Sequence, residues 1–341
     1  MKLFSNEIVF RGHPDKVCDQ ISDAILDQCL CQDRGSRCGV EVVGGKNAIF
    51  ITGEITTGAK IDIQGIARRV LRDVGYRDDY RIIVDIGVQS QDINLGTSAS
   101  AGGAGDNGMM FGYATNETEK MLPKAMCILQ DLSRAYDELR KIDNRLLPDG
   151  KAQITGEYDQ SFRLQKIKTL TLCYQNTEDQ RKHTDATLAC LVNNILLGYG
   201  LSMPEHLLIN PTGRFCIGGF DGDAGLTGRK IVVDSYHGFA PVGGGAFSGK
   251  DPTKVDRSGA YKARQIAKDM LRLHDLAWCE VQLSYSIGIK EPMAIYITSD
   301  KGDIDAPEKL YQECIPSRII KDLGLLDMQY EGLAAFGHFT D

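Results

Sequence analysis

The stretch GGGAFSGKDPTKVDRS, residues 243–258, joins a glycine-rich loop to a helix that we predict to start at Pro252. Glycine has no Cβ, so the backbone N–H groups of such a loop can approach an anion closely. Proline favours the first helical position, and a helix N-terminus also attracts anions. One predicted ridge carries the basic residues Lys250, Lys254 and Arg257, which are spaced by four and three positions. The carboxylates beside it are those of Asp251 and Asp256. The stretch therefore predicts a site for a polyphosphate and its metal; the alternative is a flexible surface turn before a solvated helix.

Composition limits the classes of protein to which the chain can belong. Its 341 residues allow two or three domains, and 42% hydrophobic with 25% charged residues is typical of a globular protein. The net charge of −7 argues against a nucleic-acid-binding domain, which is usually basic. No apolar run reaches 18 residues, and the N-terminus does not resemble a signal peptide. Ten cysteines without C-x-x-C or zinc-ligand spacing predict free thiols and a cytoplasmic protein, with no membrane partner.

A helix–strands–helix pattern occurs three times along the chain. Helices that begin at a proline are predicted at 14–31, 123–142 and 252–274. Each precedes two segments with strand composition, at 39–43 and 48–52, 151–156 and 167–174, and 279–287 and 293–298. A second helix that ends before a glycine follows each pair, at 63–74, 178–197 and 306–323. The pattern indicates three similar α/β units, with chance recurrence of a common order as the alternative.

Titratable residues cluster at the start of the first predicted helix. His13 lies just before Pro14, and Asp15, Asp19, Asp23 and Asp27 follow at intervals of four. Carboxylates at this spacing repel one another, and a cation near the helix start would relieve part of the repulsion. We expect the last two carboxylates to lie on a solvated face. For the histidine alone, a capping or core position is an equal alternative to a role in a site.

Two glycine motifs resemble nucleotide-binding sequences. Residues 103–108 match G-x-G-x-x-G, but residues 89–100 before them are polar instead of strand-like and no helix clearly follows, so we reject a dinucleotide site. Residues 244–251 nearly match the P-loop, with a predicted strand at 231–236 before them and a helix after. Asp251 replaces the Ser or Thr that would hold magnesium. A P-loop phosphotransferase or ATPase is therefore the alternative enzyme class.

Taken together, long motifs between residues 7 and 339 resemble the S-adenosylmethionine synthetase family. They are GHPDK at 12–16, GEITT at 53–57, QSQDIN at 89–94, GAGDNGMMFGYATNET at 103–118, LLPDGKAQIT at 146–155, INPTGRF at 209–215, GDAGLTGRKIVVDSY at 222–236 and GGGAFSGKDPTKVDRSGAY at 243–261. The resemblance implies an α/β (α+β type) fold of three similarly folded domains related by pseudo-threefold symmetry, with the sheets packed against each other and the helices outside. The implied boundaries are 1–88, 103–217 and 218–341, with a mobile gating loop at 89–102. This loop is shorter than the corresponding loop of the family pattern.

The resemblance also implies an activity and its participants. The sulfur of L-methionine attacks C5′ of ATP and displaces triphosphate, which is hydrolysed to diphosphate and phosphate, with two Mg²⁺ and one K⁺ per site. The implied homodimer or homotetramer has active sites at the subunit interface. Its implied catalytic residues are His13, Lys151, Arg229 and Lys250. The other alternative is a non-catalytic homologue that acts as a binding or regulatory subunit, which the intact charged set disfavours.

Binding roles follow from the positions that match the family motifs. The implied ATP ligands are His13, Asp106, Asp149, Lys151, Arg214, Phe215, Asp223, Arg229, Lys230, Ala246 and Lys250. The implied methionine ligands are Glu54, Gln89, Asp223 and Lys254. The implied metal ligands are Asp15 and Asp256 for magnesium and Glu41 for potassium.

Overall fold

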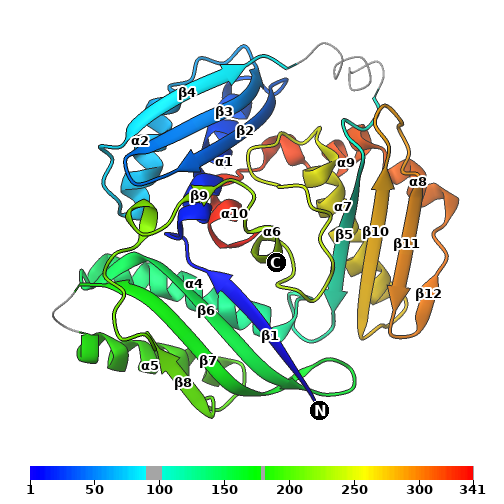
Figure 1. Ribbon diagram of the computed structural model, residues 1–341. Coiled ribbons are helices and arrows are strands. Elements are labelled where there is room, and N and C mark those ends of the chain that lie inside the picture. Colours follow the sequence, from blue (N-terminus) through cyan, green and yellow to red (C-terminus); the bar gives the residue numbers. More distant parts are fainter. Residues whose placement is uncertain (90–101, 178–180, 341) are drawn as a thin grey trace.

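The computed structural model describes residues 1–89, 102–177 and 181–340. The strands are β1 (Lys2–Val9), β2 (Arg37–Gly44), β3 (Ala48–Thr56), β4 (Arg81–Gly87), β5 (Gly108–Thr115), β6 (Leu146–Tyr158), β7 (Leu164–Asn176), β8 (His206–Ile209), β9 (Gly225–Leu226), β10 (Trp278–Tyr285), β11 (Ala294–Ser299) and β12 (Gly302–Ile304). The helices are α1 (Pro14–Gln32), α2 (Ile63–Val74), α4 (Lys124–Ile142), α5 (Arg181–Gly198), α6 (Ile231–Asp234), α7 (Val255–Leu273), α8 (Glu308–Glu313), α9 (Pro316–Asp322) and α10 (Glu331–Phe336). The described residues form three four-stranded sheets around a common centre (Figure 1).

Each sheet takes one strand from a distant part of the chain. The strand orders are β4-β3-β2-β9, β1-β6-β7-β8 and β12-β11-β10-β5. Thus the N-terminal strand β1 pairs with β6, and β5 pairs with β10. The three-unit α/β class predicted from the sequence is confirmed. The exact domain boundaries stay a prediction, because strands of one sequence segment complete the sheet of another, and most of the predicted gating loop lies outside the described residues.

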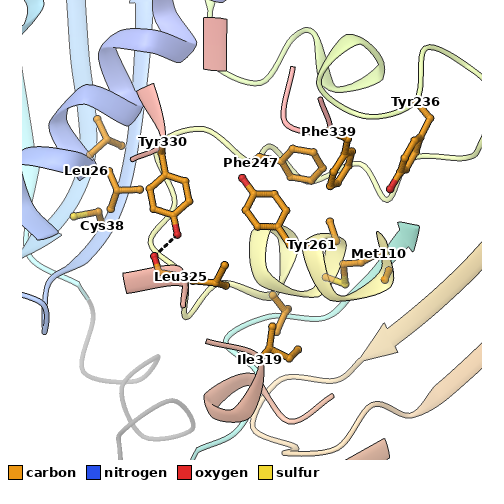
Figure 2. Close-up of a cluster of buried hydrophobic side chains, with 14 of the residues drawn as sticks. Leu26, Cys38, Met110, Tyr236, Phe247, Tyr261, Ile319, Leu325, Tyr330 and Phe339 are labelled. Carbon is orange, nitrogen blue, oxygen red and sulfur yellow. Dashed lines mark hydrogen bonds between the residues drawn. The ribbon is translucent and has the colours of Figure 1, made fainter. Parts of the chain in front are cut away.

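Two of the long helices, α1 and α7, lie inside the molecule, whereas the resemblance implied helices outside packed sheets. Helix α1 is buried along most of its length, as is α7. Both lie between the sheets in Figure 1, where the C-terminal residues also end. Figure 2 shows the aromatic core at this centre, where Phe339 stacks on Tyr236 at 4.8 Å and packs edge-on against Phe247 and Tyr261. Helix α7 contributes Tyr261 to this core, and both helices carry buried charged residues, among them Asp23 and Arg257.

Most predicted elements are confirmed, and three of them need correction. The predicted strand at 231–236 is wrong, since Ile231–Asp234 forms the short helix α6. Helix α7 begins at Val255 instead of Pro252, because a turn closed by Asp251 precedes it. The predicted helix at 306–323 is divided into α8 and α9, since Ile315 before Pro316 has extended backbone angles that a following proline favours. The strand–loop–helix context that favoured a P-loop is therefore absent from this described segment.

The acidic residues of α1 contact distant segments of the chain. The prediction that Asp23 faces solvent is therefore wrong. Three of the α1 carboxylates are wholly buried, and Asp27 is partly buried. Each accepts hydrogen bonds from the backbone of a distant segment: Asp15 from Leu226, Asp19 from Gly228, Asp23 from Gly249, and Asp27 from Tyr330 and Glu331. Backbone N–H donors stabilise a buried carboxylate, so the repulsion expected along α1 is offset by these contacts.

Candidate functional site

The larger cavity of the candidate site has a volume of about 680 Å³. Its wall combines strands β2 and β3, the glycine loop after α6, and the start of α7. The predicted site residues that line it are Glu41, Glu54, Gln89, Asp106, Ala246, Lys250, Lys254 and Asp256. The structure therefore brings together about half of the predicted set: the predicted potassium ligand, one predicted magnesium ligand, most of the predicted methionine ligands and part of the predicted ATP ligands.

The glycine loop holds its charged residues in ion pairs. Lys250 Nζ lies 2.5 Å from Asp256 Oδ2, and Lys254 Nζ lies 2.6 Å from Asp251 Oδ2. Gly245 lies close to Asp256: a Cβ at this position would be 2.2 Å from the Asp256 carboxylate and would have to displace it. The two lysines thus face the cavity with carboxylates beside them, which suits a site for an anion and its cation.

Two residues of this stretch have roles that sequence reasoning missed. Arg257 is not part of a basic ridge toward the ligand: it is wholly buried behind the loop. Asp251 is also buried; it accepts hydrogen bonds from the backbone N–H groups of Cys38, at 2.8 Å, and Thr253, at 2.9 Å. Asp before Pro-Thr is a common turn sequence, so a signal for this structural role was present in the sequence.

Strands β2 and β3 supply the carboxylates of the opposite wall. Glu41 and Thr52 are register partners, as are Gly39 and Glu54, so the two glutamates lie on the same face of the sheet. Gln89 follows β4 and is buried, and its backbone N–H donates to Thr56 Oγ1. These residues give the cavity hydrogen-bond acceptors on the side facing the lysines.

The smaller cavity has a volume of about 210 Å³ and holds a second part of the predicted set. Its lining includes His13, Asp149, Lys151, Phe215 and Asp223. An acidic pair, a lysine, an imidazole and one aromatic ring suit recognition of a nucleotide with part of its phosphate chain. Arg214 is exposed beside Phe215 and lies in neither cavity wall.

His13 both caps α1 and lines this cavity. Its Nδ1 accepts the Asp15 N–H at 3.2 Å. Burial first, and then the positive charge of Lys230, lower the pKa of His13 to about 4. The imidazole is therefore neutral at pH 7, and since Nδ1 is an acceptor its proton is on Nε2.

Carboxylates beside His13 are strongly perturbed or paired. Burial raises the pKa of Asp149 to about 6, although the Gly219 N–H bonded to it opposes this shift. Asp15 Oδ2 lies 2.5 Å from Lys230 Nζ, and Asp15 Oδ1 lies 3.6 Å from Arg229 Nε. The predicted cations of the triphosphate site therefore meet the predicted magnesium ligand directly.

One chain does not bring the two cavities into one site. Residues 225–230 lie between them: Thr227 and Gly228 line the larger cavity, whereas Arg229 and Lys230 reach Asp15 beside the smaller one. Asp15 and Asp256, the predicted magnesium ligands, thus belong to different groups. Within the described ranges, no cluster of three or more His, Cys, Asp or Glu could by itself hold a metal ion. No helix in the same ranges is long and apolar enough to cross a membrane.

Comparison with known proteins identifies the family of the chain. Residues 1–95 match the model of the S-adenosylmethionine synthetase N-terminal domain, residues 101–215 the central domain and residues 217–341 the C-terminal domain. Among similar curated proteins, the S-adenosylmethionine synthase of Nitratiruptor sp. is 42% identical over 99% of this chain and 92% of its own length. The S-adenosylmethionine synthase of Clostridium tetani is 41% identical over 99% of this chain and 94% of its own length. On this evidence the chain belongs to the S-adenosylmethionine synthetase family, whose activity is the synthesis of S-adenosylmethionine.

Proposed function

We propose that the chain joins ATP and L-methionine by attack of the methionine sulfur on ribose C5′. The whole triphosphate leaves and is then hydrolysed to diphosphate and phosphate. The observation that carries this proposal is the convergence of the predicted ligands on two cavities, one with nucleotide ligands and one with methionine and phosphate ligands. A thioether sulfur attacks without losing a proton, so this reaction needs positioned substrates and charge stabilisation instead of a general base.

Stabilisation of the leaving triphosphate falls to His13, Lys151, Arg229 and Lys250. The neutral imidazole of His13 can donate a hydrogen bond from Nε2 to an oxygen of the breaking bond. The guanidinium of Arg229 can bind two phosphate oxygens at once, and each lysine acts as a point charge. In this proposal these donors stabilise the negative charge that grows as the C5′–O bond breaks, which lowers the barrier.

The residues also fit Mg²⁺ and K⁺, as a synthetase of this metal-dependent family requires. Mg²⁺ in nucleotide enzymes is commonly held by one or two carboxylates together with substrate phosphates. Asp15 and Asp256 are such single carboxylates, each paired with a predicted phosphate-binding lysine. Bound Mg²⁺ would neutralise phosphate charge there, while the lysines exchange their carboxylate partners for phosphate oxygens. The carboxylate of Glu41, exposed at the rim of the larger cavity, suits K⁺.

A second copy of the chain completes each site in this proposal. Val43, Phe50 and Ile83 are neighbours in register across β2, β3 and β4, and their side chains are 42%, 36% and 37% exposed. Glu41 and Glu54 lie further along the same sheet face, since alternate strand residues share a face. In this proposal a partner covers this apolar row and brings its own smaller cavity toward the larger one. Such an apolar row is typical of an interface.

A product assay tests the proposal. Purified protein is incubated with ATP, L-methionine, Mg²⁺ and K⁺, and the products are identified by mass spectrometry, with a sample lacking methionine as the control. We expect S-adenosylmethionine with equal amounts of diphosphate and phosphate. Phosphate or ADP formed without methionine would support a phosphotransferase instead, and bound ATP without turnover would support a regulatory subunit.

A further inference from the structure

The glycine loop of the larger cavity is fixed from behind by a buried ion pair. Arg257 and Asp23 are both wholly buried, and Arg257 Nη2 lies 2.5 Å from Asp23 Oδ1. The same nitrogen donates to the Phe247 carbonyl at 2.6 Å, and the same carboxylate oxygen accepts the Gly249 N–H at 2.8 Å. The pair thus binds the loop backbone on both sides of Ser248.

The two bonds hold the segment between the loop's two ligand-bearing positions. Ala246, Ser248 and Lys250 line the cavity, and Phe247 to Gly249 are buried. Gly249 has φ +82°, and a Cβ there would lie 2.0 Å from the Val40 carbonyl oxygen, so its backbone fits closely against β2. A loop with this many glycines has high conformational entropy when free. The hydrogen bonds at Phe247 and Gly249 therefore fix the backbone position from which the Lys250 side chain extends.

The geometry requires an arginine and not simply a positive charge. Arg257 Nη1 also donates to Tyr261 Oη at 3.1 Å, and the guanidinium lies 4.3 Å from the centroid of the Tyr330 ring. A planar guanidinium can stack on the ring while two of its nitrogens donate to three acceptors; a lysine ammonium has its three donors on one nitrogen and no plane to stack. A buried ion pair is also weak as a source of stability, since apolar replacements are often as stable. Its contribution here is to fix the path of the loop.

We propose that Arg257, with Asp23, is a positioning residue for adenosyl transfer that sets the location of Lys250 and Ala246. This inference rests on the proposed function. It assigns no contact with substrate to Arg257, which acts through the Phe247 carbonyl and, by way of Asp23, through the Gly249 N–H.

Arg257→Lys tests the proposal, and Arg264→Lys is the matched control. Arg264 lies two turns further along α7, is also buried, and donates to the carbonyls of Lys120, Tyr113 and Met121, away from the loop. Two quantities are measured for each variant: hydrogen exchange of the peptide that contains residues 243–250, and kcat and KM in the product assay. Thermal unfolding checks that both variants are folded.

For Arg257→Lys we expect exchange at the Gly249 amide to accelerate at least tenfold. We also expect kcat to fall roughly 10- to 100-fold, because misplacing a group that stabilises the transition state by about 1 Å costs this much. KM for methionine should change by less than about threefold, and Arg264→Lys should leave exchange of the loop and kcat unchanged. Asp23→Asn keeps an acceptor for Gly249, so it should show a smaller increase in loop exchange and a smaller loss of kcat. This variant tests the proposal if Arg257→Lys does not fold.

The exchange measurement separates failure of this inference from failure of the proposed function. If the wild-type protein makes no S-adenosylmethionine, the proposed function fails, yet exchange of residues 243–250 still reports whether Arg257 fixes the loop. Unchanged loop exchange in folded Arg257→Lys and Asp23→Asn overturns the inference. So does a loss of kcat in Arg264→Lys equal to that in Arg257→Lys.

Discussion

The division of the ligands between two cavities predicts that two inactive variants restore activity to each other. His13→Ala disables the smaller cavity, and Lys250→Ala disables the larger one. Each substitution should lower kcat roughly 100- to 1000-fold, as loss of one donor to a developing anion does. If every site joins the smaller cavity of one protomer to the larger cavity of its partner, a hybrid dimer has one intact site and one doubly defective site.

The size of the effect follows from this arrangement. Equal amounts of the two variants that exchange subunits freely give hybrids as half of all dimers, and each hybrid has one of two sites intact, so about 25% of wild-type activity should return. The activity of either variant alone is far lower, about 1% or less. The two proteins are purified with different affinity tags, exchanged, and assayed for S-adenosylmethionine formation before and after isolation of the doubly tagged hybrid, which should have about half of the wild-type activity.

A matched control uses two variants of the same cavity. His13→Ala with Lys151→Ala leaves both sites of a hybrid defective, so no recovery is expected from that mixture. Activity of the purified His13→Ala/Lys250→Ala hybrid equal to the mean of its two parents would refute the shared site, because it would place both cavities of a working site in one chain.

Three further predictions concern single groups. Burial lowers the pKa of His237 to about 4, so its contribution to stability is complete above about pH 6.5 and is lost as the pH falls, by about 2 kcal/mol at pH 5. Urea unfolding should show a smaller loss of unfolding free energy between pH 7 and pH 5 in His237→Asn than in the wild type. Asparagine is chosen because it tolerates the positive φ of +52° at this position. Equal losses in the two proteins would contradict the assignment. Gly245→Ala should lower turnover at least tenfold with little change in melting temperature, because its Cβ would displace the Asp256 carboxylate; wild-type turnover would show that this carboxylate need not stay in place. Removal of divalent cations by a chelator should abolish turnover and added Mg²⁺ should restore it, whereas turnover that resists the chelator would exclude the magnesium role of Asp15 and Asp256.

The sequence predicted local elements well where a single segment determines them. Helix α1 follows from Pro14 at its start, and strands β2 and β3 follow from their β-branched residues and bounding turns. Residues 231–236 failed the same reasoning. They have strand composition, yet they form a helical turn that places Asp234 against the buried Lys16, a contact between residues 218 positions apart. Tertiary contacts of this kind outweigh local propensity.

The candidate site shows the same limit. The motifs named many of the charged residues that line the two cavities, because those side chains are recognisable by type and spacing. They did not show that Asp23 and Arg257 are buried partners, since a ridge of charges has the same spacing whether it faces solvent or another segment. They also could not show that residues 225–230 separate the two cavities, because that depends on how three distant segments pack.

The carboxylates of α1 have a consequence for synthesis of the protein in the cell. Their backbone partners lie far along the chain, separated by 211, 209, 226 and 303 positions from Asp15, Asp19, Asp23 and Asp27. While the chain grows on the ribosome, the first helix therefore carries carboxylates whose backbone partners are not yet made. Those of Asp15, Asp19 and Asp23 appear with residues 226–249, and that of Asp27 appears with residue 330. Contacts between such distant positions form slowly. The N-terminal third therefore lacks these contacts while it is being synthesised, and its packing is completed only after residues 226–331 have left the ribosome.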